Sequence, residues 1–195
     1  MSILDLMRER RSIRSYRPDP LSEDQIKTIV EAGCLAPSAY NAQPWSFVVL
    51  TNRDAINRLS ASARNYLKSK TEAEDAIEYF GSQERLDRIK ARLQGEEDSV
   101  FYGAPCVILI LMPKGDDYAA CDCGLASENM AIYAWEQGIA SCFIGYARLC
   151  KREDLIAAGM RDDQDVVCAM TLGYSDDMKG KGLDRNFNKI QAWQK

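Results

Sequence analysis

An uninterrupted apolar stretch, VILILM at residues 107–112, restricts the fold of this chain more than any other. It predicts a strand of the fully buried kind, because no polar residue alternates with the apolar ones. A strand buried on both faces needs helices on either side of its sheet. The stretch therefore favours a layered fold.

Helical and strand-like segments alternate along the rest of the chain. The runs that predict further strands are WSFVVLT, IASCFIG and DVVCAMTLGY. Helices are predicted from Ser2 into an arginine-rich segment, from a Ser22/Gln25 capping box to Gly33, through much of region 53–97, from Tyr118 to Gln137 and over Arg152–Ala158. Because no linker or repeat interrupts this alternation, we expect one domain, residues 1–195, with helices around a central sheet.

Charge and hydropathy limit the partners of the protein. The sequence pI is about 5.0 and the charges are mixed, which argues against a nucleic-acid or membrane-surface binder with a broad basic face. The start, MSILDLMRER, reaches charged residues too early for a secretory signal, and no apolar run approaches the roughly 20 residues of a membrane span. We expect a soluble, cytoplasmic protein.

The sequence contains no histidine, which excludes Ser/His and Cys/His nucleophiles and every histidine-containing zinc site. The 7 cysteines lack a framework spacing and favour reduced thiols. Cys121 and Cys123 lie two apart in a predicted helix and point to nearly opposite sides, so packing is favoured over a redox or metal role. Neither the dinucleotide fingerprint nor the P-loop motif is present.

A cluster of arginines, RERRSIRSYR at residues 8–17, stands out in a chain of net charge −4. One guanidinium group can bind two phosphate oxygens at once, and Ser12 would add a neutral donor. If the first helix continues here, Arg10 and Arg14 share a face and Arg11 points elsewhere. The alternative is a solvated helix end, where cations complement the helix dipole.

A second polar motif follows in the loop APSAYNAQPW at residues 36–45. Ser38, Asn41 and Gln43 gather hydroxyl and amide groups between two prolines that limit the freedom of the loop. Such a loop can present donors and acceptors to a flat heterocycle with alternating carbonyls and ring nitrogens. An ordinary capped turn is the alternative interpretation.

These motifs occur in an order that resembles the FMN-dependent nitroreductase family. The matching pieces are RRSIRSYRPDPLSEDQI, CLAPSAYNAQPWSFVVL, FYGAPCVILI, DCGLASENMAIYAWEQGIASCFIG and LGY. The resemblance implies an α+β fold, a three-layer α-β-α sandwich with a central mixed, mainly antiparallel sheet. It also implies an intertwined homodimer with one FMN per subunit in a cleft between the two chains.

The resemblance assigns cofactor contacts to the arginine cluster. It puts Arg10, Ser12 and Arg14 around the FMN, with Arg10 on the phosphate side. Arg14 resembles the cation near the N1/O2 edge of the flavin, where negative charge collects on reduction. Arg11 is a further candidate, with a structural role as the alternative, whereas Arg8 and Arg17 are expected to face solvent or form salt bridges.

Two further segments resemble family contacts to FMN. The loop residues, some of them reaching the flavin of the partner subunit, are Pro37, Ser38, Ala39, Asn41 and Gln43. Ile144 and Gly145 resemble the segment whose backbone approaches the flavin N5 region, where a glycine permits close approach. Trp45, beside the loop, is expected in the core.

The resemblance weakens in the tail and in region 53–97. Arg185 and then Lys181 are the candidates for the basic residues that return to the FMN phosphate, and a solvated tail is the alternative. Region 53–97 corresponds to a variable helical segment that helps to cover the flavin. Its candidates for lining a substrate pocket are Tyr66, Tyr79 and Phe80, with helix packing as the alternative role.

The function implied by the resemblance is an oxidoreductase that moves hydride from NAD(P)H through FMN to a nitroaromatic, quinone or enone in a ping-pong cycle. No side chain has to act as a nucleophile or metal ligand, which fits the missing histidines. The alternatives are a reductive dehalogenase, a flavin-fragmenting or oxygen-dependent member of the same family, a flavin-binding carrier or regulator without turnover, and a cysteine redox protein.

Overall fold

The computed structural model describes residues 2–95, 98–179 and 185–194. Within these ranges the strands are β1 (Ser46–Leu50), β2 (Cys106–Pro113), β3 (Ala140–Ile144) and β4 (Gln164–Gly173). They form one sheet in the order β1-β2-β4-β3, and each neighbouring pair is antiparallel. A parallel bridge between Ser12 and Ser141 adds to the free side of β3. The expected mixed, mainly antiparallel sheet is confirmed.

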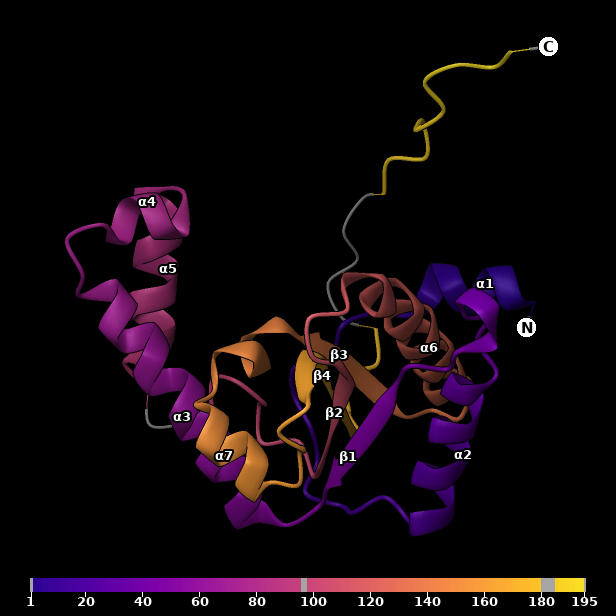
Figure 1. The fold of residues 1–195 in the computed structure, drawn as a ribbon, viewed down its shortest axis with the longest axis horizontal. Helices are drawn as coiled ribbons and strands as arrows, with labels where there is room; N and C mark the ends of the chain where they lie inside the picture. Colours follow the sequence, from indigo (N-terminus) through magenta and orange to yellow (C-terminus); the bar gives the residue numbers. More distant parts are fainter. Residues whose placement is uncertain (1, 96–97, 180–184, 195) are drawn as a thin grey trace.

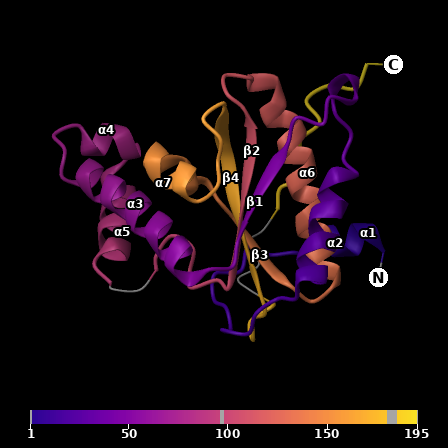
Figure 2. The same cartoon turned by 60° about the horizontal axis from the view of Figure 1, so that its bottom comes forward.

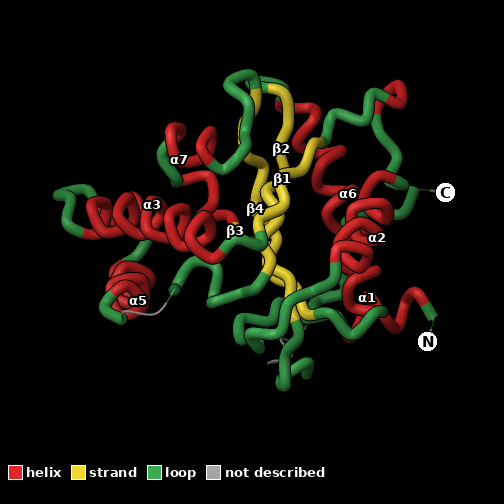
Figure 3. The backbone as a smooth tube through the Cα atoms, turned by 90° about the horizontal axis from the view of Figure 1, so that it is seen from below, coloured by secondary structure: helices red, strands yellow, loops and turns green. Residues whose placement is uncertain are grey.

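Helices cover both faces of this sheet, as Figures 1 and 3 show. One face carries α2 (Glu23–Cys34) and α6 (Asp117–Glu136), with α1 (Ile3–Glu9) beside α6. The other face carries α3 (Arg53–Thr71), the short η2 helix (Gly145–Leu149) and α7 (Arg152–Ala157). The expected three-layer α+β sandwich is therefore confirmed.

The apolar stretch 107–112 occupies the centre of the sandwich. Ile108 and Ile110 pack in the cluster under α2 and α6, whereas Val107 and Leu109 pack in the cluster under α3. All four side chains are fully buried. Burying each such side chain contributes about 1.5–3 kcal/mol, which explains why β2 lies between two strands and not at an edge.

The second helix begins as predicted. The Ser22 hydroxyl accepts a hydrogen bond from the Gln25 backbone N–H at 3.2 Å, and the Gln25 side chain accepts one from the Ser22 backbone N–H at 2.9 Å. This reciprocal pair is the expected capping box, and it fixes the start of α2 at Glu23. Trp45, just before β1, is 8% exposed and belongs to the core, as expected.

The first helix reaches the start of the arginine cluster, but the prediction that Arg10 and Arg14 share a face of that helix is wrong. Helix α1 ends at Glu9, and the following backbone is extended up to its bridge with β3. The Ile13 N–H donates to the Ser141 carbonyl at 3.0 Å, and the Ile13 side chain is 3% exposed. Burial of this β-branched side chain against the sheet outweighs the propensity of the arginines for helix.

Region 53–97 contains three helices in its described residues. Helix α4 (Ala76–Phe80) and helix α5 (Gln83–Leu93) stack on the far part of α3. Figure 1 shows this outer arm (α4 and α5) standing away from the sheet. A small apolar cluster holds the arm to α3; its buried members are Leu67, Ala76, Phe80, Leu86 and Ile89.

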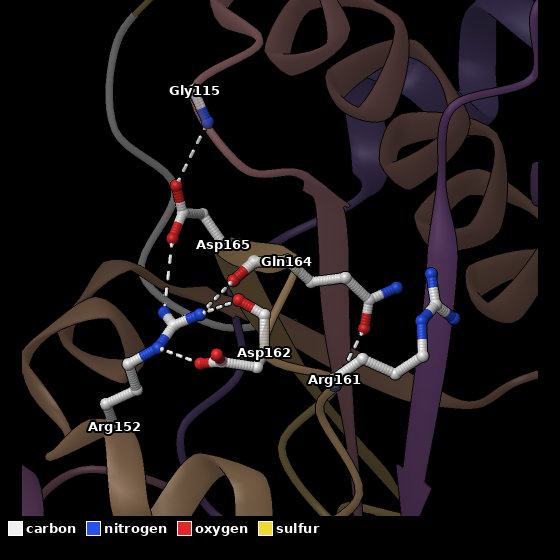
Figure 4. A network of polar contacts seen from close by, with 6 residues as sticks. All are labelled: Gly115, Arg152, Arg161, Asp162, Gln164 and Asp165. Atoms are coloured by element: carbon white, nitrogen blue, oxygen red, sulfur yellow. Dashed lines mark hydrogen bonds and ion pairs between the residues drawn. The ribbon is translucent and has the colours of Figure 1, made fainter.

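A polar network joins α7 to the start of β4 (Figure 4). Arg152 donates to the Asp162 carboxylate at 2.9 Å and lies 3.5 Å from that of Asp165. The Asp165 carboxylate also accepts from the Gly115 N–H at 3.3 Å. The hydrogen bond from Arg152 lowers the pKa of the Asp162 carboxyl. This network lies at the end of the sheet opposite the Ser12–Ser141 bridge.

Helices that combine the length and the apolarity needed to cross a membrane are absent from the described part of the chain. Residues 185–194 have no regular secondary structure and extend away from the sandwich in Figure 1. They expose three large apolar side chains, Phe187, Ile190 and Trp193.

Candidate functional site

The arginine segment, residues 10–14, presents its polar side chains on one side. In an extended backbone alternate residues share a side, so Arg10, Ser12 and Arg14 face one way while Ile13 turns into the core. Arg10 is half-buried and lies 3.3 Å from the Glu128 carboxylate, although its Nε–H makes no hydrogen bond. The predicted grouping of these three residues is thus produced by strand geometry, not by a helix face.

Arg11 lies on the other side and caps α1. Its guanidinium donates to the backbone carbonyls of Arg8 at 2.5 Å, Glu9 at 3.0 Å and Arg10 at 3.0 Å. These carbonyls have no partner inside the helix, so Arg11 fills the structural role that was its alternative.

The outer arginines of the cluster form surface ion pairs, as expected. Arg8 pairs with Asp5 at 3.5 Å, and Arg17 pairs with Asp19 at 3.1 Å and Asp176 at 3.7 Å.

Arg185 returns from the tail to the same place. Its guanidinium donates to the Met7 carbonyl at 3.0 Å and lies within 3.4 Å of the Arg10 carbonyl. A further cation therefore stands beside Arg10. The other tail candidate, Lys181, lies outside the described residues.

The amide loop, residues 37–43, is held by its own polar groups. The Ser38 hydroxyl accepts from the Gln43 N–H at 2.9 Å, and the Asn41 side-chain oxygen accepts from the Gln43 side chain at 3.1 Å. The Ala39 N–H donates to the Asp122 carboxylate at 3.1 Å, which ties the loop to α6. Pro37 is exposed, like most of the loop.

The backbone of the amide loop is strained. Tyr40, Asn41 and Gln43 have φ values of 52°, 55° and 46°, in the left-handed region that costs an L-residue roughly 1–2 kcal/mol. The Tyr40 side chain is fully exposed, so its own packing does not compensate for this cost. Clustered strain of this kind is typical of a loop that is shaped for binding.

The arginine segment and the amide loop lie at opposite ends of the sheet (Figure 2). Ser12 bridges to Ser141, which is level with Cys106 at the start of β2, whereas the amide loop leads into Ser46, which is level with Leu111. The two positions differ by about 17 Å along the strands and, because Ser12 lies beyond β3, by four strand spacings across them. One chain therefore does not bring the two motifs together.

A pocket of about 670 Å³, here the arginine pocket, opens at the Arg14 end of the sheet. Its lining joins three predicted residues, Arg14, Ile144 and Gly145, to others that the sequence did not indicate: Arg88, Arg92, Tyr102, Phe143 and Tyr146. A Cβ built on Gly145 would meet no protein atom within 4 Å. Packing of the protein itself therefore does not require a glycine here, whereas the close approach of a flat ligand would.

A second pocket of about 450 Å³, here the aromatic pocket, adjoins the first across Gly145 and Tyr146. Tyr79 and Phe80 line it, although the Phe80 side chain is only 5% exposed and also holds the outer arm. Tyr66 is not among its lining residues.

Tyr102 is a site residue that sequence reasoning missed. The guanidinium carbons of Arg14 and Arg92 lie 5.9 Å and 4.9 Å from the centroid of the Tyr102 ring. The backbone φ of Tyr102 is 58°. The Asp98 carboxylate shapes this turn by accepting from the N–H groups of Val100 and Phe101. Its position depends on a left-handed turn in FYGAP, and no local sequence motif marks that turn.

The donor set around the arginine pocket fits an anionic, flat cofactor. Arg14 makes no ion pair with any described residue, and its contact with a backbone carbonyl, that of Ser12, is long at 3.3 Å. Such a guanidinium can turn toward a ligand at little cost. Together with Arg10 and Ser12 it offers both charged and neutral donors, as a phosphate with a polar ring edge would require.

The two neighbouring cysteines of α6, Cys121 and Cys123, differ in their environment. Cys123 is buried and Cys121 is exposed, so the pair points to different sides of α6 as predicted. Burial raises the pKa of the Cys123 thiol to about 11, which keeps it protonated at neutral pH. Among the residues described, no group of three or more His, Cys, Asp or Glu side chains could hold a metal ion.

Comparisons with known proteins agree with this geometry. A 4-nitrobenzoate reductase from Pseudomonas putida is 29% identical over 192 residues, covering 86% of this chain and 83% of that protein. An oxygen-insensitive NADPH nitroreductase from Helicobacter acinonychis (strain Sheeba) is 25% identical over 183 residues, covering 86% and 85%. A crystal structure of a nitroreductase with bound FMN from Desulfitobacterium hafniense DCB-2 superimposes with a TM-score of 0.82 at 27% identity, covering 100% of both chains.

The model of the Nitroreductase family matches residues 7–174, which contain the arginine segment, the amide loop and every strand of the sheet. A match over this much of the sequence, on a sandwich with this topology, leaves one assignment: the chain belongs to the nitroreductase family.

Proposed function

We propose that this protein is an FMN-dependent oxidoreductase that takes hydride from NAD(P)H and passes it to a small oxidised acceptor, a nitroaromatic, a quinone or an enone. The observation that carries the proposal is the arginine pocket, where Arg14 meets Ile144 and Gly145 in a family whose relatives include an FMN-bound nitroreductase. Bound FMN would supply the hydride chemistry between donor and acceptor.

The residues of the chain bind and orient this cofactor. Arg10 and Ser12 would hold the phosphate, and Arg185, which lies next to Arg10, would add positive charge. Arg14 would contact the ring edge, where a cation stabilises negative charge. The backbone at Gly145 would permit close approach of the cofactor, and donor and acceptor would use the neighbouring aromatic pocket in turn.

A homodimer is part of the same proposal. The amide loop is needed at the flavin but lies at the far end of its own sheet, so it would serve the site of a second copy. Helix α1 exposes Ile3, Leu4 and Met7, and Leu125 is exposed on the neighbouring α6. Together with the apolar side chains of the tail, this surface supplies the apolar area that a permanent dimer buries.

The proposal also gives the outer arm a role at the site and the protein a cellular compartment. Helix α5 lines both pockets and helix α4 lines the aromatic pocket, so region 53–97 would cover the flavin and bound the space for the acceptor. All 7 cysteines are free thiols, which suits the reducing cytoplasm.

The test is a flavin spectrum of the purified protein under anaerobic conditions. We expect bound or readily added FMN, bleaching by NADPH or NADH, and recovery of the oxidised spectrum with a nitroaromatic or a quinone. A protein that fails to take up added FMN would refute the proposal. Binding of FMN without bleaching would instead indicate a carrier, and release of halide or consumption of flavin would indicate a specialised member of the family.

A further inference from the structure

The walls of the two pockets are strongly basic in an acidic protein. The formal net charge of the chain is −4, yet neither set of lining residues includes an Asp or a Glu. The arginine pocket is lined by Arg14, Arg88 and Arg92, and the aromatic pocket by Arg85 and Arg148. Like charges gathered in one depression repel each other, so this arrangement favours an anionic ligand.

Helix α5 delivers much of this charge by its periodicity. Arg85, Arg88 and Arg92 follow the spacing i, i+3, i+7 and therefore form one stripe along the helix. The adjacent stripe, with Leu86 and Ile89, is buried against α3 and α4. The way α5 packs on the arm thus turns its basic stripe toward the pockets.

The arginines of the arginine pocket already have partners. Arg88 donates to the Glu84 carboxylate at 2.8 Å one turn away. Arg92 donates to the Ser99 carbonyl and to the Tyr102 hydroxyl, and its guanidinium lies over the Tyr102 and Tyr146 rings. Arg14 is assigned to the cofactor. These three groups do not require a further anion.

Arg85 and Arg148 differ from them. Both are exposed, and neither guanidinium forms a hydrogen bond, an ion pair or a ring contact with any described residue. They come from different walls, Arg85 from α5 and Arg148 from η2, and line the same pocket of about 450 Å³. The rest of that lining is apolar or aromatic and includes Tyr79, Phe80 and Tyr146.

From this juxtaposition we propose that Arg85 and Arg148 form an oxyanion subsite of the aromatic pocket, which selects a flat ligand that carries a carboxylate or phosphate group. The inference rests on the proposed function, because it names the substrate class of that site. The aromatic walls take the ring, and the two guanidinium groups take the charge. The same chemistry has two sources, the carboxylate of an aromatic acid acceptor and the 2′-phosphate of NADPH.

The experiment uses the FMN-loaded protein and a matched pair of acceptors, 4-nitrobenzoate and the neutral 4-nitrobenzamide. We expect kcat/KM of the wild type to favour the carboxylate. Arg85→Gln and Arg148→Gln should each lower kcat/KM for 4-nitrobenzoate about 10- to 100-fold, the effect of removing a hydrogen bond to a charged group, with less than about a 2-fold change for the amide. Arg85→Glu should reverse the preference.

A second arm measures the rate of flavin bleaching by NADPH and by NADH without acceptor. A selective loss with NADPH in the arginine variants, with the two acceptors unaffected, would support the subsite and assign the oxyanion to the donor. The control is Lys90→Gln, which removes a positive charge from the same helix away from the pocket lining and should change no ratio.

Equal effects on charged and neutral ligands in both arms, or no difference between the arginine variants and Lys90→Gln, would overturn the subsite. This result is distinct from a failure of the proposed function, in which the wild type would turn over neither acceptor. Because both arginines are exposed, the variants should fold, and unchanged FMN content verifies it.

Discussion

The arginine segment and the amide loop are attached to the same sheet in different ways. Ile13 anchors the arginine segment by burial and by its bond to Ser141, and Tyr16 reinforces it through a hydrogen bond to the Ile13 carbonyl. The amide loop has no buried side chain between Pro37 and Gln43 and depends on polar contacts and a strained backbone. In the proposed homodimer, the arginine segment would be the half of the site that is fixed within its own chain, and the amide loop would be the half offered to the second copy.

The largest expected effect tests whether the two halves come from different chains. Arg14→Glu and the double change Asn41→Ala/Gln43→Ala should each reduce turnover by at least about 100-fold. The first reverses a charge at the cofactor, and the second removes the side-chain amides of the loop. In a heterodimer of the two variants, one site carries both lesions and the other carries none. We expect about half of the wild-type activity per dimer, since the symmetric interface makes two equivalent sites.

The measurement uses two affinity tags on coexpressed chains, so that only heterodimers are isolated. Each variant paired with itself is the control. Heterodimers as inactive as both controls would mean that each site takes both motifs from one chain.

The next effect concerns stability. Ile13→Ala should lower the free energy of unfolding by about 2–5 kcal/mol, because it leaves a cavity where the arginine segment packs on the sheet. Tyr40→Ala, in the exposed amide loop, should change it by less than about 0.5 kcal/mol. Urea unfolding followed by circular dichroism compares the two variants. A similar loss for both would show that the loop is anchored as firmly as the segment.

Cofactor affinity distinguishes the roles within the arginine cluster. Arg14→Ala should raise the dissociation constant for FMN about 10- to 100-fold, because it removes a hydrogen-bonding cation from the ring edge. Arg8→Ala should leave the constant within about 2-fold, since Arg8 forms an exposed ion pair with Asp5. Titration of apoprotein by flavin fluorescence gives both values, and equal effects would contradict the assignment.

The smallest effect is a pH dependence at the anchor of the arginine segment. The Tyr16 hydroxyl donates to the Ile13 carbonyl at 2.7 Å, and burial raises the pKa of its phenol above the ordinary 10.0. The folded protein therefore holds this proton more tightly, so the stability that it contributes is complete below pH 10 and declines as pH rises further.

Tyr16→Phe should lower the free energy of unfolding by about 1 kcal/mol near neutral pH. Above pH 10, the free energy of unfolding of this variant should decline less steeply with pH than that of the wild type. Chemical unfolding at several pH values measures both slopes. Parallel slopes would show that the phenol is not the group responsible.

Much of the fold could be predicted because it follows from local pattern. The apolar run 107–112 predicted a strand buried on both faces, and Ser22 with Gln25 predicted the start of α2. The arginine cluster was misread as helix because helical propensity is a local quantity, whereas the bridge of Ser12 to Ser141 spans much of the chain. Tyr102 and Asp98 were missed for the same reason, since their roles depend on a turn that no local motif marks.

By itself, the sequence determined the layered sandwich and the family, and through the family resemblance it predicted which short segments carry polar groups for a flavin. The tertiary structure alone decided where those groups lie: Arg10, Ser12 and Arg14 on one side through strand alternation, Arg11 as a helix cap, and the amide loop at the far end of the sheet. Pattern along a chain reports which face of an element is buried, whereas the meeting of distant elements depends on register and packing.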